Sequence, residues 1–193
     1  KERNCKMRDP DYDKLSEIVF QVLFESGINE LPINMVGLCQ SRGIKIKYLP
    51  DEDMREGCCQ VHEGKPYIFI KKDGLRRRKR FTIAHELGHI LLGHIEACKT
   101  EEIERSVFSA VEEREANAFA ERLLAPLCIL EALGVTEAEQ IMHLCDVSRA
   151  VANRRLRYLQ SWYQWWNELD FTAERHRLVA QFRGYIRTIK GYY

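Results

Sequence analysis

The 193-residue sequence lacks long hydrophobic runs, an excess of charge of either sign and paired-cysteine motifs. Without about 20 consecutive apolar residues no segment spans a bilayer as a helix, so no membrane-bound part is expected. Thirty basic side chains against 29 acidic ones leave a net charge of +1, which gives no field to recruit nucleic acid or anionic lipid. The chain begins at Lys1 and shows no secretory pattern.

Cysteine pairs suited to a disulfide framework or a thiolate zinc site are also missing. Seven cysteines are present and none forms a Cys-x-x-Cys motif. Cys58 and Cys59 are adjacent, too close in sequence for an ordinary disulfide. Cys128 and Cys145 lie in apolar helical contexts, where cysteine behaves as a small hydrophobic residue. This usage predicts a reduced, cytoplasmic protein.

Hydrophobic periodicity predicts an α+β chain with one good core and no internal repeats. A small mixed sheet is expected to pack on the helices, with a first domain over residues 1–130 and a helical C-terminal region over 131–193 packed on it. Strands are predicted at 44–48, 58–63 and 67–71. Helices are predicted at 14–25, 33–42, 77–94, 111–124, 136–145 and 148–159, with one or two more within 160–193.

The strongest functional signal is the sequence His85-Glu86-Leu87-Gly88-His89, in the most apolar predicted helix. Positions i and i+4 of a helix differ by about 40°, so both imidazoles project from one face and can hold one metal ion. Glu86 lies about 100° from His85, close enough to reach water at that metal. Two hydrogen-bonded core histidines are the alternative interpretation.

A catalytic zinc needs a third protein ligand and an open fourth position. His94 lies nine residues after His85, about 180° around the same predicted helix. The longer pattern HExxHxxGxxH is absent, because Leu92 and Ile95 stand where it requires Gly and His. His94 is therefore expected to be a helix-end residue, and a supporting role beside a ligand stays open.

The helix predicted over 111–124 offers a better third ligand. A helical wheel puts Glu113 on the apolar face with Ala116 and Ala120, whose small side chains allow close approach to the histidine-bearing helix. A carboxylate on that face is unfavourable unless it is paired or binds a metal. Glu115 falls about 200° away, towards the exposed edge, and is the alternative ligand. Asn117, one turn beyond Glu113, can hydrogen-bond a neighbouring ligand.

Three motifs together resemble the ImmA/IrrE family of bacterial metallopeptidases: RFTIAHELGH, then EREANAFA, then LLAP. The resemblance covers about residues 14–160, and its sharp motifs lie within 80–126. It implies a zincin-like domain with one Zn²⁺ per chain. By the same resemblance His85, His89 and Glu113 are the zinc ligands and Glu86 is the catalytic base.

The resemblance also implies a cytoplasmic zinc endopeptidase from a mobile-element or stress-response locus. The expected substrate is a specific bacterial regulatory protein, a helix-turn-helix repressor or its regulator. The alternative is a non-catalytic transcription-regulating or toxin–antitoxin component that keeps zinc for structure. The oligomeric state and the scissile bond are left open.

Residues 137–159 resemble a helix-turn-helix, with Ser148 as the N-cap of the second helix. On the helical wheel Arg149 and Arg157 face outward, while Tyr158 faces inward with the apolar residues. The near-neutral charge of the chain favours packing on the peptidase unit over DNA binding, so nucleic acid is not an expected partner.

Three other features each have two interpretations. The basic block, residues 76–80, opposes the dipole of the helix it begins; it is expected to be a solvated turn, or else to attract an acidic partner or a nucleic-acid backbone. The strand over 67–71 either pairs with an extended substrate or is an ordinary sheet member. Trp162, Trp165 and Trp166 are expected to pack inside, with a partner-binding surface as the alternative.

Overall fold

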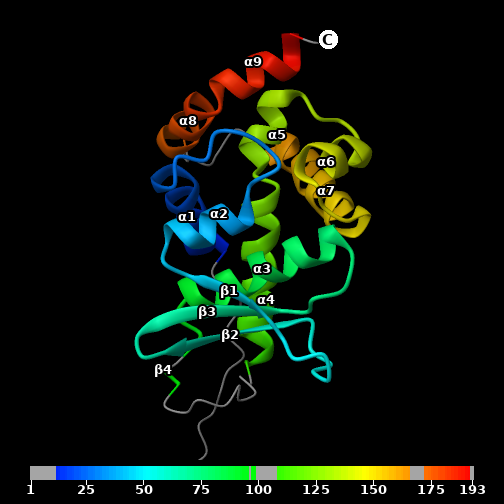
Figure 1. The fold of residues 1–193 in the computed structure, drawn as a ribbon. Helices are drawn as coiled ribbons and strands as arrows, with labels where there is room; N and C mark the ends of the chain where they lie inside the picture. Colours follow the sequence, from blue (N-terminus) through cyan, green and yellow to red (C-terminus); the bar gives the residue numbers. More distant parts are fainter. Residues whose placement is uncertain (1–11, 96, 99–107, 166–171, 192–193) are drawn as a thin grey trace, which may run out of the picture.

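The computed structural model describes residues 12–95, 97–98, 108–165 and 172–191 (Figure 1). Its helices and strands confirm the predicted α+β class and small mixed sheet. The helix α5 and the two-residue strand β4 were not predicted. In chain order the elements are α1 (Tyr12–Glu25), α2 (Met35–Ser41), β1 (Lys45–Tyr48), β2 (Gly57–His62), β3 (Lys65–Ile70), α3 (Arg76–Leu91), β4 (Ala97–Cys98), α4 (Ala110–Leu124), α5 (Leu127–Leu133), α6 (Ala138–Cys145), α7 (Arg149–Trp165), α8 (Thr172–Gln181) and α9 (Arg183–Gly191).

The strands form one sheet in the order β1-β3-β2-β4. β3 pairs in parallel with β1 and antiparallel with β2, so both of its edges are occupied. The hypothesis that this strand pairs with an extended substrate is therefore wrong, and β3 is an ordinary sheet member. Its side chains Ile68 and Ile70 are buried in the core.

Helix α3 packs against the sheet on one side and against α4 on the other (Figure 1). The two helices approach closely because Gly88 has no side chain: a Cβ there would lie 3.0 Å from Cδ1 of Phe119 and 3.3 Å from Cα of Ala116. Ala116 and Ala120 are completely buried. The predicted close approach of the two helices is thus confirmed.

The remaining helices gather around the end of α4 that points away from the sheet (Figure 1). Helix α1 packs on α4 and α8, and α5 packs on α7, α8 and α9. The buried residues form one cluster that extends from Leu15 to Phe182. Among the described residues no helix has the length and hydropathy needed to cross a membrane. The division at residue 130 falls inside α5 and stays a prediction.

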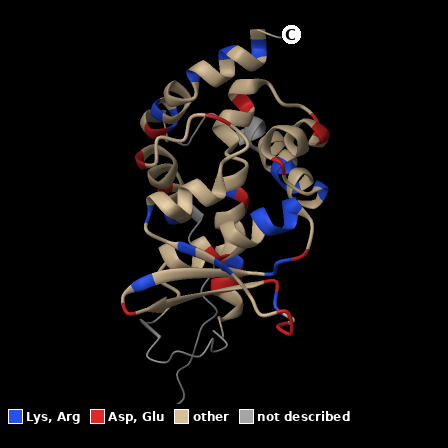
Figure 2. Ribbon diagram, viewed as in Figure 1, with Lys and Arg blue, Asp and Glu red and all other residues tan. Residues whose placement is uncertain are grey.

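The basic block forms the first turns of α3, and Figure 2 shows it as a blue segment. It is helical rather than a turn, and three of its arginines converge on the carboxylate of Asp146, in the bend between α6 and α7, while Arg78 pairs with Glu56 at the surface. The shortest nitrogen–oxygen distances to Asp146 are 2.8 Å from Arg76, 3.2 Å from Arg77 and 3.4 Å from Arg80. Arg80 also donates to the main-chain carbonyl of Cys145. The block therefore ties the start of α3 to the α6–α7 pair.

Helix α7 begins where the sequence predicted, since the Ser148 hydroxyl accepts a hydrogen bond from the backbone N–H of Val151. The predicted inward position of Tyr158 is wrong, because half of this residue is exposed. Arg155 is buried instead, and its Nε donates to the carbonyl oxygen of Ala125 at 2.9 Å. That carbonyl belongs to the C-cap of α4, where a cation is favourable.

The predictions for the tryptophans cannot be compared with the structure. Trp166 lies outside the described residues, and so do the side chains of Trp162 and Trp165. Further along the chain, Phe182, between α8 and α9, is completely buried and Tyr185 packs partly against the core.

Replacing Asp146 with asparagine is expected to lower the free energy of unfolding. Asparagine tolerates the left-handed backbone at this position (φ 52°), so the change removes the charge without straining the turn. Three arginines then lose their shared carboxylate, which costs about 2–3 kcal/mol. Urea unfolding measures the loss, with the exposed Asp51→Asn as the control. An unchanged unfolding midpoint would contradict the tying role of Asp146.

Candidate metal centre

Three side chains from α3 and α4 converge on one point. His85 and His89 project from the same face of α3, and their Nε2 atoms are 3.1 Å apart. Glu113, in the first turn of α4, places one carboxylate oxygen 3.4 Å from Nε2 of His85 and the other 3.8 Å from Nε2 of His89. These ligand atoms all lie within 4.8 Å of one another, so the structure brings together the three residues that the sequence indicated.

The spacing of these atoms fits a tetrahedral zinc ion. Zn–N bonds of about 2.0–2.1 Å put two ligand nitrogens about 3.3 Å apart. The two imidazole nitrogens are near this separation. The three ligand atoms, one from each residue, lie within 4.8 Å of one another, so an oxygen of Glu113 has to move closer by on the order of 1 Å to complete the tetrahedral site. The Glu113 side chain is 46% exposed, so it can make that adjustment and leave an open side for water. Two neutral imidazoles and one carboxylate form a donor set typical of catalytic zinc.

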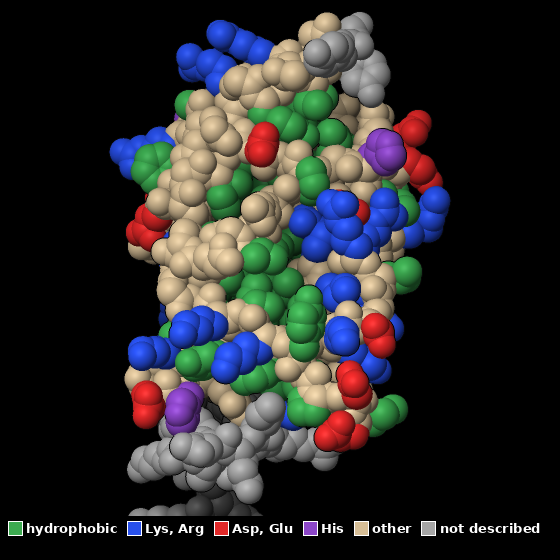
Figure 3. Space-filling model, in the orientation of Figure 1, with side chains coloured by type: hydrophobic (Ala, Val, Ile, Leu, Met, Phe, Trp, Pro, Cys, Tyr) green, Lys and Arg blue, Asp and Glu red, His purple; other side chains and the backbone are tan. Residues whose placement is uncertain are grey.

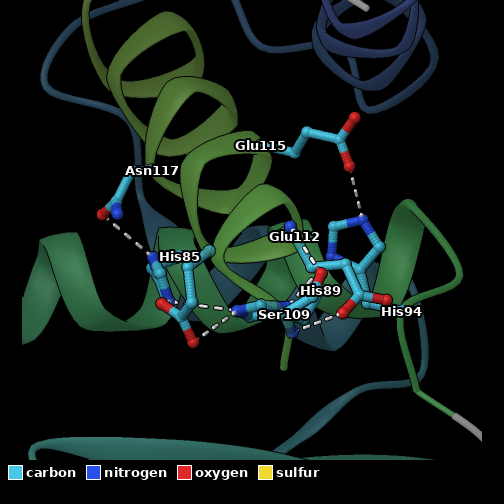
Figure 4. Close-up of polar contacts among 8 residues, drawn as sticks. His85, His89, His94, Ser109, Glu112, Glu115 and Asn117 are labelled. Carbon is cyan, nitrogen blue, oxygen red and sulfur yellow. Dashed lines mark hydrogen bonds and ion pairs between the residues drawn. The ribbon is translucent and has the colours of Figure 1, made fainter. Parts of the chain in front are cut away.

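The other ring nitrogen of each histidine has a partner of its own (Figure 4). Nδ1 of His85 lies 3.2 Å from Oδ1 of Asn117, as predicted for a residue that supports a ligand. Nδ1 of His89 lies 3.0 Å from Nδ1 of His94. An Asn oxygen can only accept, so Nδ1 of His85 carries the proton, and its Nε2 is free to bind a metal.

His94 reaches His89 because α3 ends earlier than the sequence predicted. The helix stops at Leu91, and Gly93 adopts a left-handed conformation with φ 73°. The backbone N–H of His94 then bonds to the carbonyl of His89, and that of Gly93 to the carbonyl of Ile90. This is the Schellman arrangement, which turns the chain back over the last helical turn. The expectation that His94 lies about 180° from His85 on a continuing helix is therefore wrong.

Glu115 extends the series of hydrogen bonds that runs from His89 to His94. Its Oε2 lies 3.2 Å from Nε2 of His94, and its side chain is only 20% exposed (Figure 4). The carboxylate accepts from Nε2–H of His94, which leaves Nδ1 of His94 to accept from Nδ1–H of His89. The expected exposed position of Glu115 is wrong. Glu115 does not join the three converging ligand atoms but fixes the tautomer of His89 through His94.

Burial keeps both candidate histidine ligands neutral. His89 is completely buried, and burial with the nearby His85 and His94 lowers its pKa to about 3. Burial also lowers the pKa of His85, against the opposing effect of the Glu113 charge. A metal binds the unprotonated imidazole, so the site is ready to accept one throughout the neutral range.

Glu86, on the sheet-facing side of α3, is only 6% exposed. Burial, and then the negative charge of Glu113, raise the pKa of Glu86 to about 7, while a hydrogen bond from Cys59 opposes the shift. Its Oε2 atom is buried and has no hydrogen-bond partner among the described residues. A carboxyl group with a pKa near neutrality is suited to take up and release a proton.

Two aromatic rings enclose the histidines. Phe108 stacks on the ring of His89, with the centroids 3.6 Å apart and the planes within 13°. Phe81 lies one turn before His85, with its centroid 6.4 Å away. Phe108 was not predicted from the sequence, because this residue lies outside the helix that carries Glu113 and belongs to no recognisable motif. The stacked Phe108 ring contributes to the burial of His89, and burial is the main cause of the lowered pKa of this residue.

Two comparisons with known proteins find similarity, one to a protein family and one to a solved structure. The IrrE N-terminal-like domain, a peptidase family, matches residues 39–157. A solved structure described as a Mycobacterium tuberculosis transcriptional regulator has a similar fold, with a TM-score of 0.53 at 18% sequence identity. The match covers 84% of this chain and 49% of that one, so this chain spans about half the length of its structural neighbour. A search of the curated proteins finds no match.

Proposed function

Because the chain belongs to the IrrE N-terminal-like peptidase family, we propose that it is a zinc-dependent endopeptidase. The convergence of His85, His89 and Glu113 carries this proposal. Two helices bring the three ligand atoms together, while Glu86 stands beside them with a pKa near neutrality. A site built only for structural zinc has no need of such a group and has four protein ligands rather than three.

His85, His89 and Glu113 would hold the zinc ion, with Asn117 and His94 keeping the two rings in the required tautomers. A zinc ion bound there would polarise the peptide carbonyl and lower the pKa of the attacking water to around 7. Glu86 accepts a proton from that water and delivers it to the leaving amine. Its buried setting keeps this proton from exchanging freely with solvent.

For the substrate we propose a specific bacterial regulatory protein in the cytoplasm, a helix-turn-helix repressor or a protein that controls one. The similar fold of a Mycobacterium tuberculosis transcriptional regulator supports a regulatory setting. The alternative role is a non-catalytic regulator with structural zinc. The α6–α7 pair is a weaker candidate for DNA reading, because Asp146 ties the turn between its helices to α3.

Two measurements test the proposal. Elemental analysis of the purified chain is expected to give about one zinc per chain. The zinc-loaded chain is then incubated with peptides from a bacterial proteome and with the intact proteome, and new N-termini are identified by mass spectrometry. Cleavage that requires zinc and the Glu86 carboxylate supports the peptidase. A zinc-loaded chain that produces no new N-termini in either mixture contradicts it and favours the non-catalytic role.

Replacing His94 with alanine is expected to weaken zinc binding by about 10–100-fold, because the change removes the partner of Nδ1 of His89. Competition with a chelator measures the dissociation constant. The conservative Glu115→Gln keeps an oxygen that accepts from His94 and is expected to weaken binding less. Equal zinc affinity in the wild type and His94→Ala would contradict the orienting role of His94.

A further inference from the structure

A cleft opens between the start of α3 and the start of α7, with a volume of about 860 Å³. The exposed guanidinium groups around it belong to Arg76, Arg78 and Arg149, whose side chains are 74%, 67% and 62% exposed. Figure 3 shows basic side chains gathered at the level where Figure 1 places the start of α3. We call this region the arginine cleft.

The arginine cleft carries more positive charge than its acidic neighbours neutralise. Asp146 alone faces Arg76, Arg77 and Arg80. Each of the three other arginines of the cleft has one carboxylate of its own. These pairs are Arg78 with Glu56, Arg149 with Glu139 and Arg154 with Glu121. Counting Arg80, which contacts Asp146 but does not line the cleft, six arginines face four carboxylates. An excess of two charges is concentrated here in a chain whose net charge is +1.

The exposed arginines can exchange their present partners for a ligand. Exposed ion pairs contribute about 0–1 kcal/mol each, so the pairs of Arg78 and Arg149 are easily replaced. The first turn of α3 adds to the positive electrostatic potential of the cleft. Its N-cap residue Leu75 offers no side-chain acceptor, and no acidic residue lies in that turn. The positive end of the α3 dipole therefore adds to the positive charge of the cleft, where Asp146 is the one carboxylate among the lining residues.

The cleft also has an apolar component and leads towards the metal centre. Leu75 is 79% exposed at its rim, and Phe81 lines it. The Phe81 ring also faces the His85 ring, one turn along α3. From Arg77 to His85 the distance along the helix is about 12 Å, which about four extended residues span. One polypeptide can thus occupy the cleft and the metal centre together.

Resting on the proposed peptidase function, we propose that the arginine cleft binds an acidic segment of the protein substrate. Carboxylates of that segment pair with Arg76, Arg78 and Arg149, while an apolar side chain contacts Leu75 and Phe81. The scissile bond then lies about four residues from the acidic segment. A nucleic-acid backbone fits less well, because the cleft is concave, partly apolar and only two charges in excess.

Peptide binding tests the cleft without requiring catalysis. The probes are a fluorescein-labelled decapeptide of glutamate, aspartate and leucine and its counterpart with glutamine and asparagine in place of the acids. Fluorescence anisotropy is measured with the full zinc-loaded chain, with the double variant Arg78→Gln/Arg149→Gln and with a charge-matched control, Arg183→Gln/Arg187→Gln on exposed positions of α9.

The wild-type chain is expected to bind the acidic peptide more tightly than the neutral one. The double variant Arg78→Gln/Arg149→Gln is expected to bind the acidic peptide about tenfold more weakly, because two exposed charge contacts are lost. The α9 control is expected to match the wild type. Equal binding of both peptides, or an unaffected cleft variant, would overturn the proposal. The proposal would also be overturned if a 20-base-pair DNA duplex bound more tightly than the acidic peptide and the cleft variant lost that binding. That result would assign the cleft to nucleic acid.

A hydrolysis assay distinguishes a failure of the cleft proposal from a failure of the proposed peptidase function. With the proteome-derived peptides, acidic residues are expected to be enriched about four residues from the cleaved bonds, and the enrichment to disappear in the cleft variant. Hydrolysis without that enrichment overturns the cleft and leaves the peptidase intact. Acidic-peptide binding without any hydrolysis supports the cleft as an acidic-segment site and contradicts the peptidase.

Discussion

Replacing Glu86 with glutamine is expected to lower kcat for peptide hydrolysis by a factor of about 10²–10⁴. Glutamine has nearly the same shape but cannot accept a proton from water. The loss should appear in kcat rather than in KM, because Glu86 acts on the reacting atoms and does not hold the substrate. Kinetics on the peptides cleaved by the wild type measure the effect, with zinc content determined on the same samples.

The zinc content of Glu86→Gln is expected to equal that of the wild type, since Glu86 is not one of the three converging ligands. Glu121→Gln is a suitable control: Glu121 is also a buried helical glutamate, but it pairs with Arg154 away from the metal centre. The control should retain hydrolysis. If Glu86→Gln retained full hydrolysis as well, another group would be the base and the proposed role of Glu86 would be wrong.

Replacing Glu113 with alanine is expected to weaken zinc binding strongly. Loss of a direct ligand should weaken binding by more than the roughly 10–100-fold that loss of an outer partner causes. The two remaining imidazoles cannot complete a three-ligand site, so elemental analysis after dialysis should show well under one zinc per chain.

Glu115→Ala is the matched comparison, because it removes an equivalent carboxylate two residues further along α4. We expect an intermediate zinc affinity for it, since Glu115 acts through His94. The order wild type, Glu115→Ala, Glu113→Ala would support the assignment of the two carboxylates. The reverse order of the two variants would make Glu115 the third ligand and refute the assignment based on geometry.

The metal-binding residues could be predicted because their arrangement is set by local helix geometry. His85 and His89 share a face of any regular helix, and Glu113 lies one turn before Ala116, whose small side chain marks the closely packed face of α4. His94 could not be placed by the same rule, because its position depends on where α3 ends. Gly93 immediately before it was the available signal, since glycine at that position commonly reverses the chain.

Ion pairs between residues that are far apart in the sequence could not be predicted from the sequence alone. The partner of Arg80 lies 66 residues away, at a left-handed turn that no local pattern associates with α3. Arg155 was missed for another reason. The wheel puts it on the same face as Val151 and Leu159, but a charged residue type argued against burial. Its buried position depends on the C-cap carbonyl of α4, which is visible only once α4 and α7 are packed.

The contacts of Asp146 have a consequence for the order in which the chain folds during synthesis. A ribosome adds about 5–20 residues per second, so the 66 residues from Arg80 to Asp146 take roughly 3 to 13 seconds. During that interval Arg76, Arg77 and Arg80 at the start of α3 oppose its dipole without their shared counter-ion. The first turns of α3 therefore gain their ion pairs with Asp146 only when the C-terminal half has emerged. The ion pairs of Asp146 thus couple the helix that bears His85 and His89 to the folding of the C-terminal half.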